Sequence, residues 1–481
     1  MRFIPGMFLL LPLLAGCTVG PVYQPPRATL PTAWTAATQP AGQARAVDLP
    51  TWWLAFEDPA LTALIAQARA ANLDLRLAFA RLQQARAQYG VTAADAYPTV
   101  TANGGITHQR RSMHGLTAAP GSGAETNLYQ AGFDASWELD FFGYVKHNVT
   151  AAGLDVQAAQ ASWDDALLTL TAEVARNYLE LRSAQNRLAI AQHNIAAQAD
   201  ALALAQTRVQ AGLSSDLDVA QAQALLSATR AQVPVFETQI QQTLHALDVL
   251  LGREPGAVSK ELAAAPAAAV HGGGSRILPL GLPAELLARR PDVRRAERQL
   301  AAATARVGVA TADLYPHFML TGSIGLQSLQ AGDFFEGPSR FYTLGPSVRW
   351  PILDFQRLRA RVKVQDALTQ QALATWEKTW RTALAEVENA LVAYYQEQAR
   401  GTELRAALVA QQRALNLSED LYRQGLVTYL NVIDAQRQVY GSEDALAQSD
   451  NAVAQNLVAL CKALGGGWQT DMIPPARRPG R

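Results

Sequence analysis

A strict alternation of apolar and polar residues runs through Tyr129-Gln130-Ala131-Gly132-Phe133-Asp134-Ala135-Ser136-Trp137-Glu138-Leu139. Successive side chains of a β-strand point to opposite faces, so this pattern predicts a strand with one apolar and one polar face. A strand of about ten residues can cross a lipid bilayer when it is tilted.

Three further segments alternate in the same way. Strands are therefore expected at about 97–108 and 128–140 in the first half of the chain, and at about 316–327 and 342–354 in the second half. The alternation also fits half-buried strands of a soluble sheet, because each membrane strand gives only a weak signal. The long helices predicted after each pair of strands favour membrane strands.

Apolar residues recur at intervals of seven after each pair of strands, which predicts helices in left-handed coiled packing. No proline lies between Tyr144 and Gln210, so a single helix of about 65 residues and about 100 Å is expected there. The two heptad series are Leu167, Val174, Leu181, Leu188, Ile195, Leu202 and Val209, and Leu373, Trp380, Val387, Tyr394, Leu408, Leu415 and Tyr422.

Gly212 and Gly425 follow these heptads, and glycine permits the left-handed conformation with which many helices end. The chain is expected to turn there and return along helices 214–251 and 427–464. This predicts two long helical hairpins, at 144–251 and 356–464. Shorter helices at 57–96 and 284–314 precede the strands and are expected to stack end to end on the return helices.

The chain contains an internal duplication. Gly90, Asp95, Tyr97 and Pro98 recur 218 residues later as Gly308, Asp313, Tyr315 and Pro316, and Glu173-Val174 recurs 213 residues later as Glu386-Val387. We assign a first repeat to residues 51–251 and a second to residues 284–464. Residues 252–283 link the two repeats, and residues 465–481 form a C-terminal tail.

The N-terminus has the layout of an export signal, with Arg2 ahead of a short apolar run. Leu14-Ala15-Gly16-Cys17 resembles the bacterial lipobox. It predicts a signal peptide over 1–16 and a mature Cys17 with diacylglycerol on sulfur and an acyl chain on nitrogen. Thr18, in place of aspartate, favours export to the outer membrane. Six prolines follow within residues 17–50, which indicate an extended, lipid-anchored leader.

Composition excludes several classes of function. Lys+Arg and Asp+Glu are both 41, so no sequence-wide charge favours nucleic acid. The seven histidines lack zinc-ligand spacing, and the sequence has no P-loop or nucleophile motif. We expect no catalytic residue, no metal and no cofactor other than the covalent lipid on Cys17.

Each strand hairpin returns the chain to the side from which it came, so all helices are expected on the periplasmic side. Four strands cannot close a barrel, and open strand edges do not persist in lipid, so several chains must pool their strands. Three chains would give twelve strands and an open bore, whereas eight strands leave a lumen filled by side chains. The sequence therefore predicts a homotrimer of mixed α and β structure.

The chain resembles the outer membrane factor family, the TolC-like ducts of tripartite efflux pumps, and within it the lipidated OprM-like or NodT-type branch. The motifs that carry the resemblance span some 400 residues in order. They are Trp53-x-x-Phe56-x-Asp58-Pro59, Glu138-Leu139-Asp140-Phe141-Phe142-Gly143, Arg289-Arg290-Pro291-Asp292-Val293, Tyr422-Arg423-Gln424-Gly425, Tyr429-Leu430-Asn431-Val432-Ile433-Asp434-Ala435-Gln436 and Ala463-Leu464-Gly465-Gly466-Gly467-Trp468.

The resemblance implies a trimeric twelve-stranded barrel in the outer membrane, continuous with a periplasmic helical tunnel and girdled near 252–283. It implies a periplasmic adaptor and an inner-membrane pump of the RND type as partners. The function implied is passive exit of drugs or other small molecules. A duct for secreted polypeptide (type I secretion) and a coiled-coil lipoprotein without a channel remain as alternatives.

Matches to the family's closed gate place candidate constriction residues at Tyr422, Asp434, Asn431 and Asp218. Asn431 and Asp434 share a helix face, so a trimer would present rings of both to the bore. Asp434 could also be a solvated helix charge, and Tyr422 could simply pack. Some relatives have arginine where this chain has Val427, so Asp218 is expected to lack that salt bridge.

The hairpin turns are the predicted docking points for the adaptor. They contain Gly212, Leu213, Gly425 and Leu426. Termination of the helices by the two glycines is compatible with such a role.

Overall fold

The computed structural model describes residues 18–28, 31–35, 48–110, 112, 125–262 and 289–468. Cys17 and the predicted signal peptide lie outside the described residues, as do parts of the predicted leader, linker and tail. The chain divides into two compact units. The first comprises Met1–Arg27, Arg81–Gln160 and Arg295–Glu377, and the second comprises Ala28–Ala80, Ala161–Arg294 and Lys378–Arg481.

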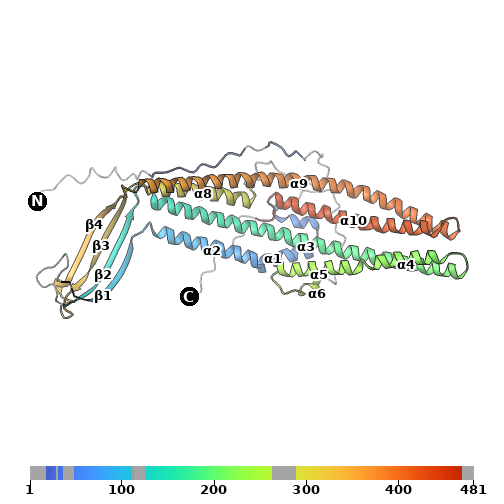
Figure 1. Ribbon diagram of the computed structural model, residues 1–481, viewed down its shortest axis with the longest axis horizontal. Coiled ribbons are helices and arrows are strands. Elements are labelled where there is room, and N and C mark those ends of the chain that lie inside the picture. Colours follow the sequence, from blue (N-terminus) through green and yellow to red (C-terminus); the bar gives the residue numbers. More distant parts are fainter. Residues whose placement is uncertain are drawn as a thin grey trace. The chain divides into compact units, whose positions relative to one another are not determined.

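The first unit contains one antiparallel sheet with strand order β1-β2-β3-β4 (Figure 1). The strands are β1 (Thr99–Arg110), β2 (Glu125–Leu139), β3 (His317–Ser328) and β4 (Arg340–Arg349). The expectation that the last strand continues to residue 354 was wrong. It ends at Arg349, two residues before Pro351, which has no N–H group to donate to a neighbouring strand.

The register of the sheet collects the apolar side chains of all four strands on one face. Phe133 of β2 lies opposite Ala102 of β1 and Ile324 of β3, and Ile324 lies opposite Tyr342 of β4. Large members of this face are exposed in the single chain, including Val100, Ile106, Phe133, Ile324, Tyr342, Leu344 and Val348. An exposed apolar surface of this kind marks contact with lipid or another protein.

The start of the described leader is held against the first unit. The Val19 N–H donates to the Phe142 carbonyl at 3.1 Å, and His147 Nε2 lies 2.8 Å from the Val19 carbonyl oxygen. The backbone crosses α8 at Gly308 so closely that a Cβ added to Gly20 would lie 2.7 Å from the Gly308 Cα. Both crossing residues are glycines because there is no room for a side chain.

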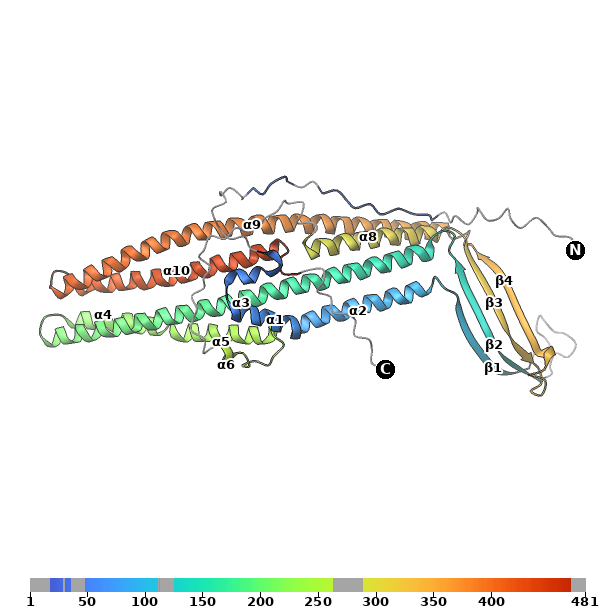
Figure 2. The ribbon, with the colours of Figure 1, turned by 180° about the vertical axis from the view of Figure 1, so that it is seen from behind.

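Two long helices dominate the chain. They are α3 (Tyr144–Gln210, 67 residues) and α9 (Phe355–Arg423, 69 residues). In the second unit the heptad positions Val174 and Leu181 of α3 and Val387 of α9 are fully buried, as coiled packing requires. The chain then returns along each long helix, through α4 and α5 beside α3 and through α10 beside α9 (Figure 2).

The remaining described elements are shorter. No described helix has the length and apolar character needed to span a membrane. The elements are η2 (Leu49–Phe56), α1 (Pro59–Ala71), α2 (Leu73–Ala94), α4 (Asp216–Arg230), α5 (Val233–Leu250), α6 (Ser259–Leu262), α8 (Pro291–Ala312), η3 (Gly337–Ser339) and α10 (Tyr429–Ala463).

Two helices that were predicted to be continuous are broken. The segment 214–251 consists of α4 and α5, and the break falls just before Pro234, where a helix cannot continue without losing a hydrogen bond. The segment 57–96 consists of α1 and α2, which meet at Asn72. The Asn72 side chain accepts from the Leu75 N–H at 2.9 Å and so caps α2.

Residues 218 apart repeat the same contact to the end of a return helix. Asn72 Nδ2 donates to the carbonyl of Leu250, the last residue of α5, at 2.9 Å. Arg290 Nη1 donates to the carbonyl of Ala463, the last residue of α10, at 3.1 Å. Each contact ties the segment before a repeat's first long helix to the end of that repeat's return helix, and supplies a donor for a helix-end carbonyl.

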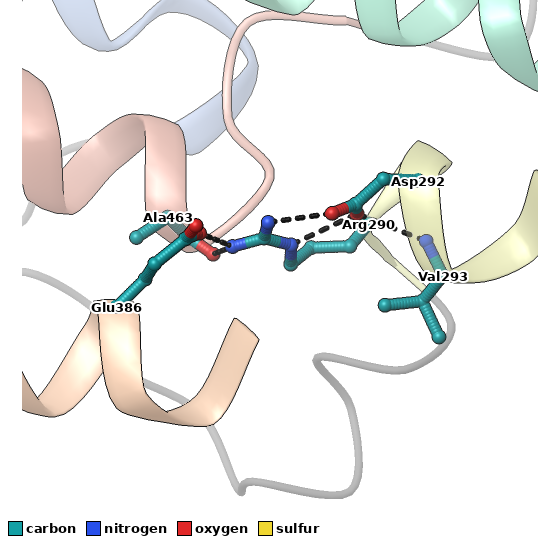
Figure 3. A network of polar contacts seen from close by, with 5 residues as sticks. All are labelled: Arg290, Asp292, Val293, Glu386 and Ala463. Carbon is teal, nitrogen blue, oxygen red and sulfur yellow. Dashed lines mark hydrogen bonds and ion pairs between the residues drawn. The ribbon is translucent and has the colours of Figure 1, made fainter. Parts of the chain in front are cut away.

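Arg290 is also the centre of an ionic network (Figure 3). Its guanidinium contacts Asp292 in a bidentate pair at 3.0 and 2.7 Å, and Glu386 of α9 at 2.6 Å. Burial alone would lower the pKa of Arg290, but Asp292 and Glu386 outweigh burial and raise it. The network joins the start of α8 to α9 and α10 within the second unit.

Replacement of this arginine is expected to loosen the second unit. Arg290→Met removes three partners at once and leaves Asp292 without its cation, which should cost about 3 kcal/mol, the low end for a buried pair because Glu386 is half exposed. The thermal midpoint of the helical circular dichroism signal in detergent measures it. Arg400→Met, which removes an exposed pair with Glu397, is the matched control and should cost under about 1 kcal/mol. Equal midpoints for both variants would contradict the assignment.

Candidate functional site: the hairpin tips

The two hairpin turns are built alike. Gly212 and Gly425 have φ of 71° and 75°, in the left-handed region. The Leu213 N–H donates to the Arg208 carbonyl and the Leu426 N–H to the Leu421 carbonyl, at 2.8 and 2.9 Å. These bonds satisfy carbonyls at the ends of α3 and α9 and reverse the chain within a few residues. The predicted turn glycines therefore lie where the chain reverses.

Each turn presents two exposed leucines. Leu213 and Leu426 are both 67% exposed, and Leu217 and Leu430 are 63% and 55% exposed. Leu213 and Leu426 were predicted as docking residues, whereas Leu217 and Leu430 were not. The signal for the second pair was present in the sequence, because Leu217 and Leu430 also repeat at a spacing of 213 residues.

Behind the turns, side chains from both hairpins form one apolar cluster. Tyr422 of α9 packs on Tyr429 of α10, with ring centroids 5.1 Å apart. The Arg208 guanidinium lies 4.6 Å from the centre of the Tyr422 ring, a cation–π contact. The buried members are Leu202, Ala205, Ala222, Leu226, Tyr422, Tyr429, Val432 and Ile433, and Val427 packs against them.

Asp218 is bonded locally and has no arginine partner. Its carboxylate accepts from the Ser214 hydroxyl, and the Ser214 oxygen is 3.5 Å from the Tyr422 hydroxyl. Burial, with the nearby Tyr422 and Asp218, raises the pKa of Tyr429 to about 12, so its phenol is neutral at physiological pH. The structure thus brings Tyr422 and Asp218 together through Ser214.

Asn431 and Asp434 lie away from this cluster. Both are exposed on α10, on the side opposite the buried Val432 and Ile433. The Asn431 amide oxygen accepts from Thr428 at 3.0 Å, and Asp434 lies 3.9 Å from Arg437 with 63% of its side chain exposed. The single chain therefore leaves both residues free to face a neighbouring chain or a bore.

Sequence reasoning missed three residues of the tip. Tyr429 lies seven residues after Tyr422 and so continues the heptad, a signal that was available. Arg208 and Ser214 carry no pattern, because their roles depend on which helix faces them. Among the residues that the structure describes, no cluster of three His, Cys, Asp or Glu side chains is placed to hold a metal ion.

Solved structures share this architecture along nearly the whole chain. One is the outer-membrane channel OprN, with a TM-score of 0.88 and 36% identity over 94% of this chain and 100% of that one. Another is the open state of the MtrE channel of Neisseria gonorrhoeae, with a TM-score of 0.83 and 30% identity over 94% and 98% of the two chains. The fold and the tips thus define a chain of the outer-membrane efflux channel class.

Sequence comparison gives the family. The family model described as outer membrane efflux protein matches residues 64–253 and 282–466, and the chain belongs to that family. The toluene efflux pump outer membrane protein TtgI of Pseudomonas putida is 32% identical over 97% of this chain and 98% of that protein. OprJ of Pseudomonas aeruginosa is 32% identical over 97% and 96%. The predicted family, efflux function and outer-membrane location are confirmed.

The packing of Tyr422 can be separated from its hydroxyl. Tyr422→Phe keeps the ring contacts with Tyr429 and Arg208 and loses only a long contact to Ser214, so the tip should stay intact. Tyr422→Ala leaves a cavity that costs about 3 to 5 kcal/mol locally and should open the turn. Limited trypsin digestion at Arg423 measures this opening. Rapid cleavage of the Phe variant would mean that the hydroxyl, and not the ring, holds the tip.

Proposed function

We propose that three copies of this chain form a closed exit duct for small molecules across the outer membrane. The observation that carries the proposal is the divided sheet. One face is apolar along all four strands, and in the described residues β1 and β4 each pair on one side only. Unpaired backbone edges are costly in lipid, so the strands of three chains pair edge to edge into a twelve-stranded barrel.

Aromatic side chains support a membrane interface at the helix-proximal end of the sheet. The Trp137 indole donates to the Ala96 carbonyl at 3.1 Å, and the Trp350 indole donates to the Leu314 carbonyl at 3.2 Å. Phe142 stacks on Tyr315 with centroids 4.8 Å apart. Such rings with a polar attachment are typical of the boundary between lipid and water.

The docked leader is consistent with a lipid anchor at the same level. Val19 is bonded to Phe142, beside this aromatic group. Cys17 precedes it by two residues, so acyl chains on Cys17 would enter the periplasmic leaflet next to the barrel of the same chain. Several acyl chains suffice for stable anchoring.

Cargo selection belongs to the partners of the duct. The relatives' names concern toluene, pyoverdine and cations, although each relative is about as similar to this chain as the others. A chain that serves such different cargoes conducts passively. A periplasmic adaptor seated on the leucine-bearing turns, and an inner-membrane pump of the RND type, supply energy and bias the tips between closed and open states.

At the tip, Asn431 and Asp434 of three chains form the rings that line the closed aperture. Three carboxylates close together attract cations and repel anions. Tyr422 and Asp218 act behind these rings by holding the two hairpins of one chain together, which sets the position of α10.

Single-channel recording in planar bilayers tests the duct and its gate. Wild-type protein should show small, cation-selective openings, and Asp434→Ala should enlarge them or reduce their selectivity because the carboxylate ring is removed. Asp420→Ala is the matched control, since Asp420 is an equally exposed tip carboxylate with a similar arginine neighbour. An equal effect of both variants would contradict the assignment of Asp434. A monomer that never inserts would contradict the duct.

Metabolic labelling with palmitate tests the anchor. Cys17→Ala should abolish incorporation of the label, whereas Cys461→Ser should retain it, because Cys461 is fully buried and burial raises the pKa of its thiol. Label in the Cys17 variant would contradict lipidation at this residue.

A further inference from the structure

The second face of the sheet is polar and almost uncharged. In the register of the sheet it carries Thr101 and Asn103 of β1, Ser136 of β2, and Thr321 and Ser323 of β3. Between the ends of the described strands, Asp134 is the one charged side chain on this face. Its position 213 residues later is Ser347, so the second repeat has no equivalent.

Asp134 has a hydrogen-bond partner but no cation. The Asn103 side-chain amide donates to its carboxylate. In the described part of the chain it has no ion pair, although Glu138, further along the same face, lies 2.7 Å from His317 Nδ1. The charge of Asp134 is therefore not neutralised within the chain, whereas that of Glu138 has a titratable partner.

The surroundings of Asp134 are open to solvent on the polar face. A depression of about 370 Å³ is lined by the carboxylate and by hydroxyl-bearing side chains from all four strands. They are Thr99, Thr101, Ser136, Thr321, Ser323 and Thr343. A neutral, hydrated lining does not screen a carboxylate as a neighbouring cation would, so the negative potential extends into the space above this face.

We propose that Asp134 determines ion selectivity in the barrel lumen, independently of the gate at the helical tips. The inference rests on the proposed trimer, in which the apolar faces contact lipid and the polar faces line the bore. Three chains then place three uncompensated carboxylates at one level of the barrel. Cations are concentrated there and anions depleted, over about one Debye length from the wall.

The test is the reversal potential of single channels in a KCl gradient. Asp134→Asn keeps the size and the hydrogen bond to Asn103 but removes the charge, so the potassium-to-chloride permeability ratio should fall about two-fold or more near 0.1 M salt. Near 1 M salt, where the Debye length is only about 3 Å, the difference should largely vanish. Asp434→Asn at the tip, combined with Asp134→Asn, should lower the ratio further because the two rings act separately.

Cysteine substitution decides which face lines the bore. Asp134→Cys should react with a negatively charged, membrane-impermeant methanethiosulfonate reagent in proteoliposomes, and the reaction should restore cation preference. Ala135→Cys, the adjacent residue on the apolar face, is the matched control and should not react. The buried Cys461 provides the unreactive background.

The outcomes separate the inference from the proposed function. A conducting trimer whose selectivity is unchanged by Asp134→Asn would overturn the role of Asp134 and leave the duct standing. Reaction of Ala135→Cys but not of Asp134→Cys would overturn the role of Asp134, because the polar face would then point away from the bore. A folded protein in which wild type and all variants fail to conduct would overturn both.

Discussion

The pairing requirement of backbone N–H and C=O groups in lipid is the constraint on which the proposed assembly depends. A four-stranded sheet leaves the outer edges of β1 and β4 open, and its apolar face exposes Phe133, Ile324 and Tyr342. Neither feature is stable in water or in lipid for one chain alone. Pairing with other copies removes both defects at once, and it also makes every side chain of the polar face recur around a bore.

The duplication separates residues that hold the fold from residues that act. Packing and turn residues recur between the repeats, as Gly212 and Gly425 do. Residues of the aperture and the lumen do not recur: Asp434 corresponds to Gln221, and Asp134 corresponds to Ser347. A trimer of duplicated chains therefore has nearly six-fold packing but three-fold chemistry, because each charged position occurs once per chain.

The sequence predicted the features that depend on local periodicity. Alternation located the four strands to within a few residues, and the absence of proline together with Gly212 located both ends of α3. The breaks at Asn72 and before Pro234 were missed, because heptad spacing continues across them and the sequence does not show which helix ends will be capped.

The candidate site was only partly predictable for a related reason. Tyr422 and Asp218 belong to recognisable motifs, but the contact between them runs through Ser214, which has no motif of its own. Arg208 lies on another helix, and its place above the Tyr422 ring depends on the relative rotation of α3 and α9. Sequence patterns define faces of single helices, whereas such contacts require the packing of several.

The chemistry of the polar sheet face fits a duct that serves unrelated cargoes. Conduction requires that each site along a pore hold its cargo weakly enough to release it. A lining of threonine, serine, asparagine, glutamine and glycine offers hydrogen bonds that water satisfies equally well, and it offers no apolar pocket in which a hydrophobic cargo would be retained. Charge is then the one property by which such a lining can discriminate, and charge discriminates between small ions far more than between large neutral molecules. A single carboxylate per chain can therefore set the ionic leak of the barrel without narrowing the range of molecules that the duct exports.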